Sequence, residues 1–131
     1  MAKKTHAPLK DIVEAAEDRH AEDLVILKLA ELCSFCDYFV ICHGLSSVQV
    51  RAIADGIGDS LRKHRPKVFP LHVEGHEEAS WILMDYGDVI VHVFDEATRD
   101  FYRLERLWAA APRVEPGELG VASPTPDAAA G

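Results

Sequence analysis

One strand-to-helix unit in the first half of the chain constrains the fold more than any other feature. Residues 38–42 read Tyr-Phe-Val-Ile-Cys, an aromatic and β-branched run that predicts a strand buried on both faces. Gly44 ends this strand, and Ser46 with Gln49 three residues later fits a helix-capping box. Because a helix that joins two strands of one sheet favours parallel strands, we expect this strand to pair with, or lie beside, the next strand in the chain. The helix itself carries one apolar stripe, formed by Val50, Ile53, Ala54, Ile57 and Leu61.

The rest of the chain supplies the other elements of a mixed sheet. Apolar spacing predicts a first helix over residues 9–16 and a last helix over residues 97–108. Short apolar runs predict further strands at 24–27, 71–73, 81–85 and 89–94, with a hairpin turn before the last one. This order predicts an α/β fold, a single-domain mixed sheet covered by helices. We expect residues 8–111 to form the domain, 1–7 a flexible N-terminus and 112–131 a disordered Pro/Ala-rich tail.

The balance of charge limits the partners that the chain can bind. Its 131 residues include 22 acids against 14 Lys and Arg, which gives a net charge of −8. Binding to nucleic acid draws on a basic face, so we expect no direct nucleic-acid specificity and regard a basic protein surface as the better match. We also expect no export signal and no membrane span, because no apolar run is long enough. The three cysteines, odd in number, fit a reduced, cytoplasmic compartment.

The glycine at the strand-to-helix junction raises the alternative of an enzyme that binds phosphate. Backbone amides at such a junction can point at a phosphate group, although a glycine turn and a serine cap explain the same residues more simply. A nucleotidyltransferase also needs paired carboxylates downstream to hold two metal ions. The next acids, Asp55 and Asp59, fall inside the helix, and no Asp-x-Asp or Asp-x-Glu strand follows. The sequence therefore disfavours catalysis, and we expect no catalytic residue and no cofactor.

The cysteines and histidines are expected to be structural and free of metal. Cys33 and Cys36 have Cys-x-x-Cys spacing, but no second pair completes a tetrahedral zinc site, and the pair precedes a strand instead of a helix. Small buried hydrophobic residues explain these two and Cys42 better. His92 interrupts a very apolar strand, so we expect a core histidine whose hydrogen bonds are satisfied, held by an acid such as Asp88.

Residues 81–88, Trp-Ile-Leu-Met-Asp-Tyr-Gly-Asp, combine two large aromatic residues with acids around a hairpin. These residues can be core plus turn, and for Leu83 that is the preferred interpretation. Aromatic residues flanked by charge are also typical of a partner-binding hot spot, because they exclude water around a few anchoring contacts. Composition alone leaves both interpretations open.

Two motifs resemble the Iojap, or ribosome silencing factor, family. The first is Asp37-Tyr38-Phe39-Val40-Ile41-Cys42, followed by Gly44-x-Ser46-Ser47-x-Gln49-Val50-x-Ala52-Ile53-Ala54-Asp55. The second and more specific motif comprises Val73-Glu74-Gly75, Trp81, Asp85-Tyr86-Gly87-Asp88-Val89-Ile90-Val91-His92-Val93-Phe94, Arg99, Phe101-Tyr102 and Leu104-Glu105-x-Leu107-Trp108. The resemblance covers roughly residues 8 to 109. Departures are Cys36, Leu45 and Met84, none of which touches the polar residues of the hairpin.

The resemblance implies a fold and a function. The fold is a nucleotidyltransferase-like mixed sheet without the enzyme's catalytic acids. The function is steric: the protein binds the large (50S) ribosomal subunit through large-subunit ribosomal protein fourteen, blocks association with the small subunit, and represses translation during starvation or stationary phase. The free protein is expected to be a homodimer. The resemblance places the partner-binding surface on Trp81, Ile82, Asp85, Tyr86 and Asp88, with Glu74 on its rim.

Two alternatives belong to other classes of protein. One is a nucleotidyltransferase, active or degenerate, which incubation with labelled nucleoside triphosphates and magnesium would expose. The other is a dimeric adaptor whose hairpin serves self-association, and which would stay at the top of a sucrose gradient instead of moving with ribosomal subunits.

Overall fold

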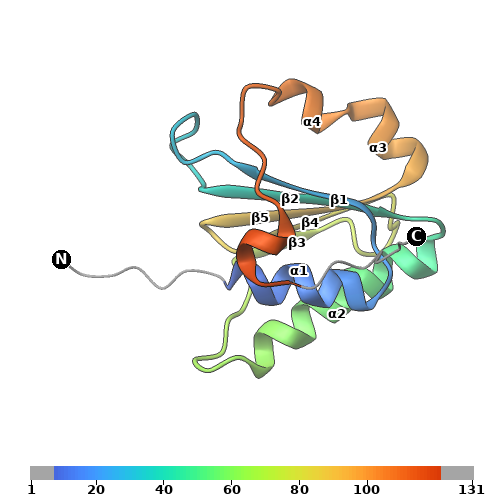
Figure 1. The fold of residues 1–131 in the computed structure, drawn as a ribbon. Coiled ribbons are helices and arrows are strands. Elements are labelled where there is room, and N and C mark those ends of the chain that lie inside the picture. Colours follow the sequence, from blue (N-terminus) through green and yellow to red (C-terminus); the bar gives the residue numbers. More distant parts are fainter. Residues whose placement is uncertain (1–7, 122–131) are drawn as a thin grey trace, which may run out of the picture.

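A five-stranded mixed sheet with helices on both faces forms the protein, as expected (Figure 1). The structure, a computed structural model, describes residues 8–121, so the expected flexible N-terminus at 1–7 and the last part of the tail lie outside the described residues. Among residues 8–121, no helix is both long enough and apolar enough to cross a membrane. The elements in chain order are α1 (Leu9–Asp18), β1 (Glu22–Lys28), β2 (Tyr38–Gly44), α2 (Ser47–Lys63), β3 (His72–Glu74), β4 (Trp81–Asp85), β5 (Val89–Asp95), α3 (Glu96–Tyr102), α4 (Leu104–Leu107) and a 3-10 helix, η1 (Pro116–Leu119).

The strand order is β1-β2-β5-β4-β3, with one parallel pair. β2 runs parallel to β5, and the other neighbours are antiparallel. The expectation that β2 would lie beside the next strand in the chain is therefore wrong, because β3 lies at the far edge. β3 has three residues, all exposed, whereas β5 has seven and is mostly buried. The strand with more apolar surface occupies the centre, and the chain reaches it through β3 and β4.

The sheet separates two hydrophobic clusters. α1 and α2 cover one face, where Ile12, Ile53 and Ile57 meet Val40 and Val91 of the central strands. α3, α4 and the segment after them cover part of the other face (Figure 1). The predicted capping box of α2 is present, since the backbone amide of Gln49 donates to Oγ of Ser46 (3.1 Å). The side chain of Gln49 accepts in turn from the backbone amide of Leu45, 2.7 Å away.

The predicted last helix is interrupted at Arg103. This residue adopts a left-handed conformation (φ 49°) that ends α3, and α4 begins with the next residue. The apolar stripe expected from Phe101 to Trp108 is consequently broken. Trp108 packs against the sheet, whereas Phe101 is 79% exposed.

The structure also differs from the expected disordered tail over residues 112–121. Lys28 donates its backbone amide to Pro112 (2.8 Å), and the Val114 amide donates to Ile26 (2.9 Å), so this segment pairs with the edge of β1. η1 follows beside α1 (Figure 1), and Val121 is buried against Val13 and Ile26. The few apolar residues of the segment are placed where the β1 edge would otherwise expose backbone groups.

Candidate docking surface

The two faces of β4 point to different parts of the protein. Ile82 and Met84 are buried against α1 and α2. The alternate residues Trp81, Leu83 and Asp85 are only partly buried and face the side of the sheet that carries α3 and α4. Because side chains of a strand alternate between its two faces, β4 contributes both to the core and to an outer surface.

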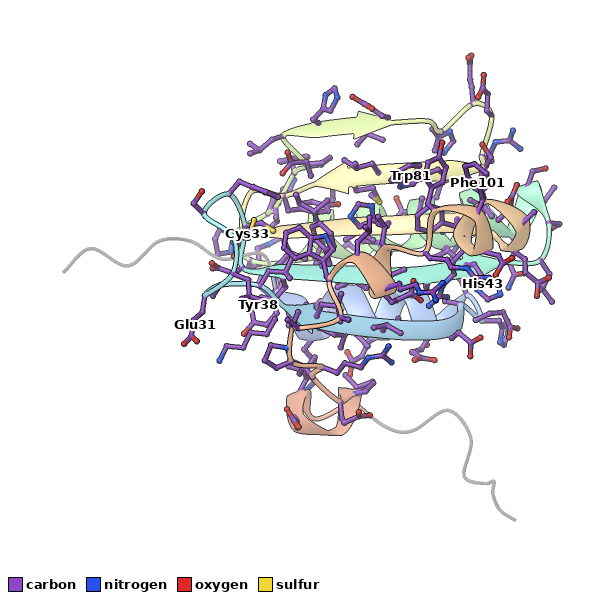
Figure 2. The ribbon with its side chains drawn as sticks, turned by 90° about the horizontal axis from the view of Figure 1, so that it is seen from above. Glu31, Cys33, Tyr38, His43, Trp81 and Phe101 are labelled. Atoms are coloured by element: carbon purple, nitrogen blue, oxygen red, sulfur yellow. The ribbon has the colours of Figure 1, made fainter. Side chains whose placement is uncertain are left out.

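α3 and α4 leave part of this second face uncovered. α3 packs on β5 and β2, and Figure 2 shows both helices over the middle of the sheet, with β4 and β3 to one side. On β3, Glu74 lies opposite Leu83 and His72 lies opposite Asp85, and both β3 side chains are exposed. Nε2 of His72 and a carboxylate oxygen of Glu74 are 2.6 Å apart. An open strip of sheet with an acidic edge results.

An aromatic patch, comprising Trp81, Phe101 and Tyr102, borders this open strip. The ring of Trp81 lies 4.8 Å from that of Tyr102, which in turn lies 4.9 Å from the ring of Phe101. Trp81 and Phe101 are side by side in Figure 2, and a shallow hollow lies between β4 and α3 at the patch. Aromatic pairs at such separations are favourable, and their exposed edges leave apolar area available to a partner.

Three residues that the resemblance places on the partner-binding surface are buried. Ile82 has no exposed area, Tyr86 is 7% exposed, and both belong to the core beneath α1 and α2. The hydroxyl of Tyr86 has no hydrogen-bond partner among the described residues, and burial raises its pKa to about 12. Asp88 is also buried, and its carbonyl accepts from the amides of Asp37 (2.7 Å) and Tyr38 (3.0 Å). These contacts join the hairpin to the start of β2.

Three of the expected residues do share the open face: Trp81, Asp85 and Glu74. Asp85 also has a local role, because its carboxylate accepts from the backbone amide of Gly87 (2.8 Å) in a turn where glycine has φ 91°. Phe101 and Tyr102 were not expected on this face: Phe101 was assigned to the apolar stripe of one long helix, and Tyr102 was noted only as part of the family motif. The signal available for them was the pairing of two large aromatic residues at successive positions, of which one helix face can bury only one.

His92 fixes the position of Trp81. The indole Nε1 of Trp81 donates to Nδ1 of His92 at 3.1 Å, so the partner of this histidine is an indole, not the acid that we expected. The His92 side chain lies next to the rings of Phe39 and Phe94 and is 4% exposed. Burial lowers the pKa of His92 to about 4, which keeps the ring neutral and able to accept.

A buried arginine supports the helices beside the patch. Arg99 is 8% exposed, and its Nε and Nη2 donate to one carboxylate oxygen of Glu105 at 3.0 and 2.6 Å. Its Nη1 donates to Nδ1 of His43 (2.9 Å) and to the carbonyl of Glu22 (3.2 Å). Burial is the largest influence on Glu105 and opposes its ionisation, but the hydrogen bonds and positive charge of Arg99, together with a backbone hydrogen bond and the charge of Arg113, give a net lowering of the pKa of Glu105. The network links α3, α4, β1 and β2 across the turn at Arg103.

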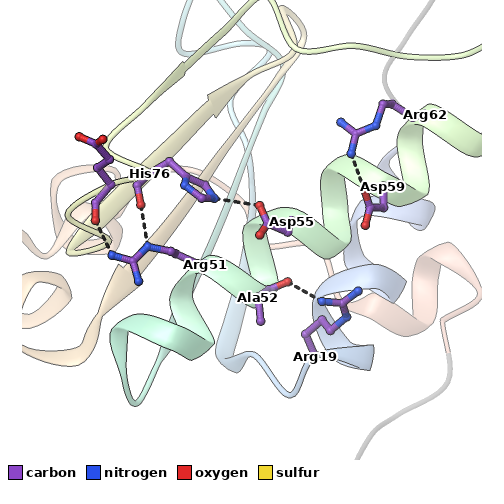
Figure 3. Close-up of polar contacts among 8 residues, drawn as sticks. Arg19, Arg51, Ala52, Asp55, Asp59, Arg62 and His76 are labelled. Carbon is purple, nitrogen blue, oxygen red and sulfur yellow. Dashed lines mark hydrogen bonds and ion pairs between the residues drawn. The ribbon is translucent and has the colours of Figure 1, made fainter.

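The strand-to-helix junction and the acids of α2 are engaged in structural contacts. Two amide donors at the junction, those of Leu45 and Gln49, are taken up by the side chains of Gln49 and Ser46. Asp55 contacts Nε2 of His76 (2.9 Å), and Asp59 pairs with Arg62 along the helix (Figure 3). Within residues 8–121, no group of His, Cys, Asp and Glu side chains is arranged to hold a metal ion.

The three cysteines are free thiols in different environments. Cys42 and Cys36 are buried, as expected of small core residues, and belong to opposite faces of the sheet. Cys33 is only partly buried, whereas we expected a buried residue.

Known proteins resemble this chain over most of its length. A protein named ribosomal silencing factor RsfS from Bacillus subtilis (strain 168) is 44% identical over 107 residues, which cover 82% of this chain and 89% of the relative. One of the same name from Halalkalibacterium halodurans is 43% identical over 103 residues, covering 79% of this chain and 86% of the relative. A crystal structure of a Chromobacterium violaceum protein has a TM-score of 0.75 and 34% identity, and covers 80% of this chain and 88% of that one.

The match to the protein family extends further along the chain than the matches to these relatives. The family model described as ribosomal silencing factor during starvation matches residues 2–130. Taken with the two relatives and the similar crystal structure, it shows that the chain belongs to the ribosomal silencing factor family.

Proposed function

We propose that this protein docks on the large ribosomal subunit and prevents the small subunit from joining. The contact is made with large-subunit ribosomal protein fourteen, and the outcome is repression of translation during starvation or stationary phase. The activity is steric and non-enzymatic, and it takes place in the cytoplasm. Membership of the silencing factor family supports the part of this proposal that concerns action on the ribosome. The one observation of the structure that supports a docking activity is the open sheet face with its exposed aromatic patch.

The docking face proposed here comprises Trp81, Leu83, Asp85, Glu74, Phe101 and Tyr102. Its aromatic patch supplies large apolar side chains at the surface, and Phe101 alone is 79% exposed. Such residues become anchors when a partner removes them from water. Glu74 and Asp85 add negative charge beside them, and the whole chain carries a net charge of −8. This charge favours a basic ribosomal protein and accelerates encounter with it.

The free protein is proposed to be a homodimer. The docking face exposes the aromatic side chains of Phe101 and Tyr102, and a second copy would cover them when no ribosome is present. Docking on the ribosome and self-association would then compete for the same aromatic residues. At a fixed excess of large subunits, dilution of the protein should therefore raise the fraction of the protein that is bound to them.

Co-sedimentation with purified large subunits in a sucrose gradient tests the proposal. Phe101→Asp places a charge in the proposed interface without touching the core, and we expect it to weaken binding by about thirtyfold or more, the cost of a hot-spot residue. Val48→Asp is the matched control, since Val48 is 73% exposed at the start of α2, a helix that covers the opposite face of the sheet. Both variants should keep the melting temperature of the parent protein.

Two further measurements separate the alternatives. Large subunits loaded with the protein should fail to form complete ribosomes with small subunits, and Phe101→Asp should restore joining. Normal large-subunit binding by Phe101→Asp, or equal loss of binding by Val48→Asp, would contradict the proposed face. If the parent protein stays at the top of the gradient and only self-associates, the adaptor interpretation replaces the ribosomal one.

A further inference from the structure

A hollow lies beside α3, near the carboxyl ends of the parallel strands β2 and β5. α2 follows β2 on one face of the sheet, and α3 follows β5 on the other face (Figure 1). α/β sheets commonly bind ligands at a place where the connections diverge in this way. The hollow has a volume of about 770 Å³, which is in the range of small-molecule sites. It is separate from the docking face, since Figure 2 shows His43 and Phe101 on different sides of α3.

A bulge in β1 forms one wall of this hollow. The pairing of β1 with β2 shifts register between Glu22 and Val25, where Asp23 adopts a left-handed conformation (φ 48°). The carbonyl of Glu22 accepts there from Nη1 of Arg99 (3.2 Å). Bulges next to binding sites re-aim the residues of a strand. Asp23 and Val25 consequently line the hollow opposite α3 and α4.

Arginine side chains are concentrated around the hollow. Four of the eight arginines of this acidic chain line it: Arg99, Arg103, Arg106 and Arg113. Arg99 pairs with Glu105 (2.6 Å), and Arg103 pairs with Asp100 (3.4 Å). Within residues 8–121, the guanidinium groups of Arg106 and Arg113 have no hydrogen bond or ion pair. These two groups therefore have donors available to a ligand.

A buried histidine adds a donor to the same hollow. His43 lines it and is 6% exposed, and its Nδ1 lies 2.9 Å from Nη1 of Arg99. Because a guanidinium group can only donate, Nδ1 accepts, and the proton of the imidazole ring is on Nε2. No described residue accepts a hydrogen bond from this Nε2. A buried N–H group that lines a hollow and has no protein acceptor indicates a ligand that supplies one.

We propose that this hollow binds the phosphate or diphosphate group of a small molecule. The phosphate oxygens accept from Nε2 of His43 and from the guanidinium groups of Arg106 and Arg113. A phosphate group offers three terminal oxygens to these donors, which come from three segments of the chain, whereas a carboxylate offers two. The planar guanidinium group also matches the geometry of phosphate. Arg99 acts indirectly, because its bond to Nδ1 directs the imidazole proton to Nε2.

The carboxylates of the hollow limit its affinity for an anion. Asp23 and Glu96 line it together with the two paired acids, so four carboxylates balance four guanidinium groups. Binding consequently depends on directed hydrogen bonds, and the two unpaired acids oppose it. Asp23→Asn should therefore tighten binding several-fold. Asparagine tolerates the left-handed conformation of this position and removes one negative charge.

Calorimetric titration of the full chain with sodium pyrophosphate, at constant ionic strength, tests the site. Arg106→Gln and Arg113→Gln should each weaken binding by about tenfold. Arg65→Gln is the matched control, since Arg65 is an exposed arginine beyond the end of α2 and outside the hollow. All three altered side chains are exposed, so the variants should keep the melting temperature of the parent protein.

Nuclear magnetic resonance locates the bound pyrophosphate. The backbone resonances of residues 23–25, 43 and 96–106 should shift on addition of pyrophosphate, whereas the indole resonance of Trp81 should not. A titration that gives neither heat nor shifts in these segments would contradict the site. The measurement uses the free protein, so its result does not depend on whether the protein docks on the ribosome.

Three further results would overturn the inference. Equal weakening by Arg65→Gln and Arg113→Gln would show that pyrophosphate is attracted by charge alone. Weaker binding by Asp23→Asn would show that this carboxylate does not oppose the ligand. Tighter binding of an oligoribonucleotide that has no terminal phosphate would assign the donors to an RNA backbone instead of a small molecule.

Discussion

The indole of Trp81 donates a hydrogen bond to Nδ1 of His92 over 3.1 Å, and this bond joins the exposed aromatic patch to the interior of the sheet. Because Nδ1 accepts, the proton of the neutral ring is on Nε2, a buried atom that has no partner among the described residues. Protonation of His92 would remove the acceptor and place a charge in an apolar cluster. The position of Trp81 thus depends on a neutral histidine.

This relationship predicts an acid-sensitive stability. The pKa of His92 is lowered to about 4 in the folded protein, from an ordinary value of 6.5. The contribution of the neutral ring is complete above about pH 6.5 and declines as the pH falls towards 4, by up to roughly 3 kcal/mol in all. The melting temperature of the parent protein should fall over this pH interval. The melting temperature of the His92→Phe variant should fall less steeply. Parallel curves for the two proteins would show that another group is responsible.

Tyr86→Phe tests whether the hairpin tyrosine belongs to the core. Its buried hydroxyl has no partner among the described residues, so removing the oxygen should leave stability unchanged or raise it by up to about 1 kcal/mol. Large-subunit binding should be unaffected, because the ring stays in place. Urea unfolding and co-sedimentation measure the two quantities. Loss of large-subunit binding without loss of stability would instead show that the Tyr86 hydroxyl contributes to docking.

Truncation tests the packing of residues 112–121. A chain that ends at Val121 is the reference, because it keeps every contact of this segment that the structure describes. A chain that ends at Ala111 loses the backbone pairing to β1 and the burial of Val121, and should be less stable by about 2–4 kcal/mol. Val121→Asp in the full chain should reproduce most of this loss. If all these chains unfold together, the packing of residues 112–121 contributes nothing to stability.

Patterns of apolar residues predicted most elements of the fold. The apolar run of β4 and the apolar stripe of α2 were both sufficient, because each element packs against a continuous layer. The position of β3 was not predictable from its neighbours in sequence, since the order of strands depends on which ones have enough apolar surface to be central. The packing of residues 112–121 was not predicted either: a few apolar residues placed along one strand edge order this segment despite a composition that is typical of disorder.

The docking face was predictable only in part. Motifs pointed to residues 81–88, but a motif does not distinguish the two faces of a strand, so Ile82 and Tyr86 were assigned to the surface together with Trp81. The exposure of Phe101 depends on a left-handed residue, Arg103, that is stabilised by tertiary contacts and has no local signal such as glycine.

The pair formed by Arg99 and Glu105 supplies those contacts, and a double-mutant cycle measures its contribution. Arg99→Met leaves the Glu105 carboxylate partly buried without its partner, and should lower the free energy of unfolding by about 3 kcal/mol. Glu105→Met leaves a buried guanidinium with fewer acceptors and should cost a similar amount. The double variant removes both charges, so its loss should be clearly smaller than the sum of the single losses. The three unfolding energies give this coupling directly. Additive losses would mean that the pair does not hold the turn at Arg103, and that α3 and its aromatic residues are positioned by packing alone.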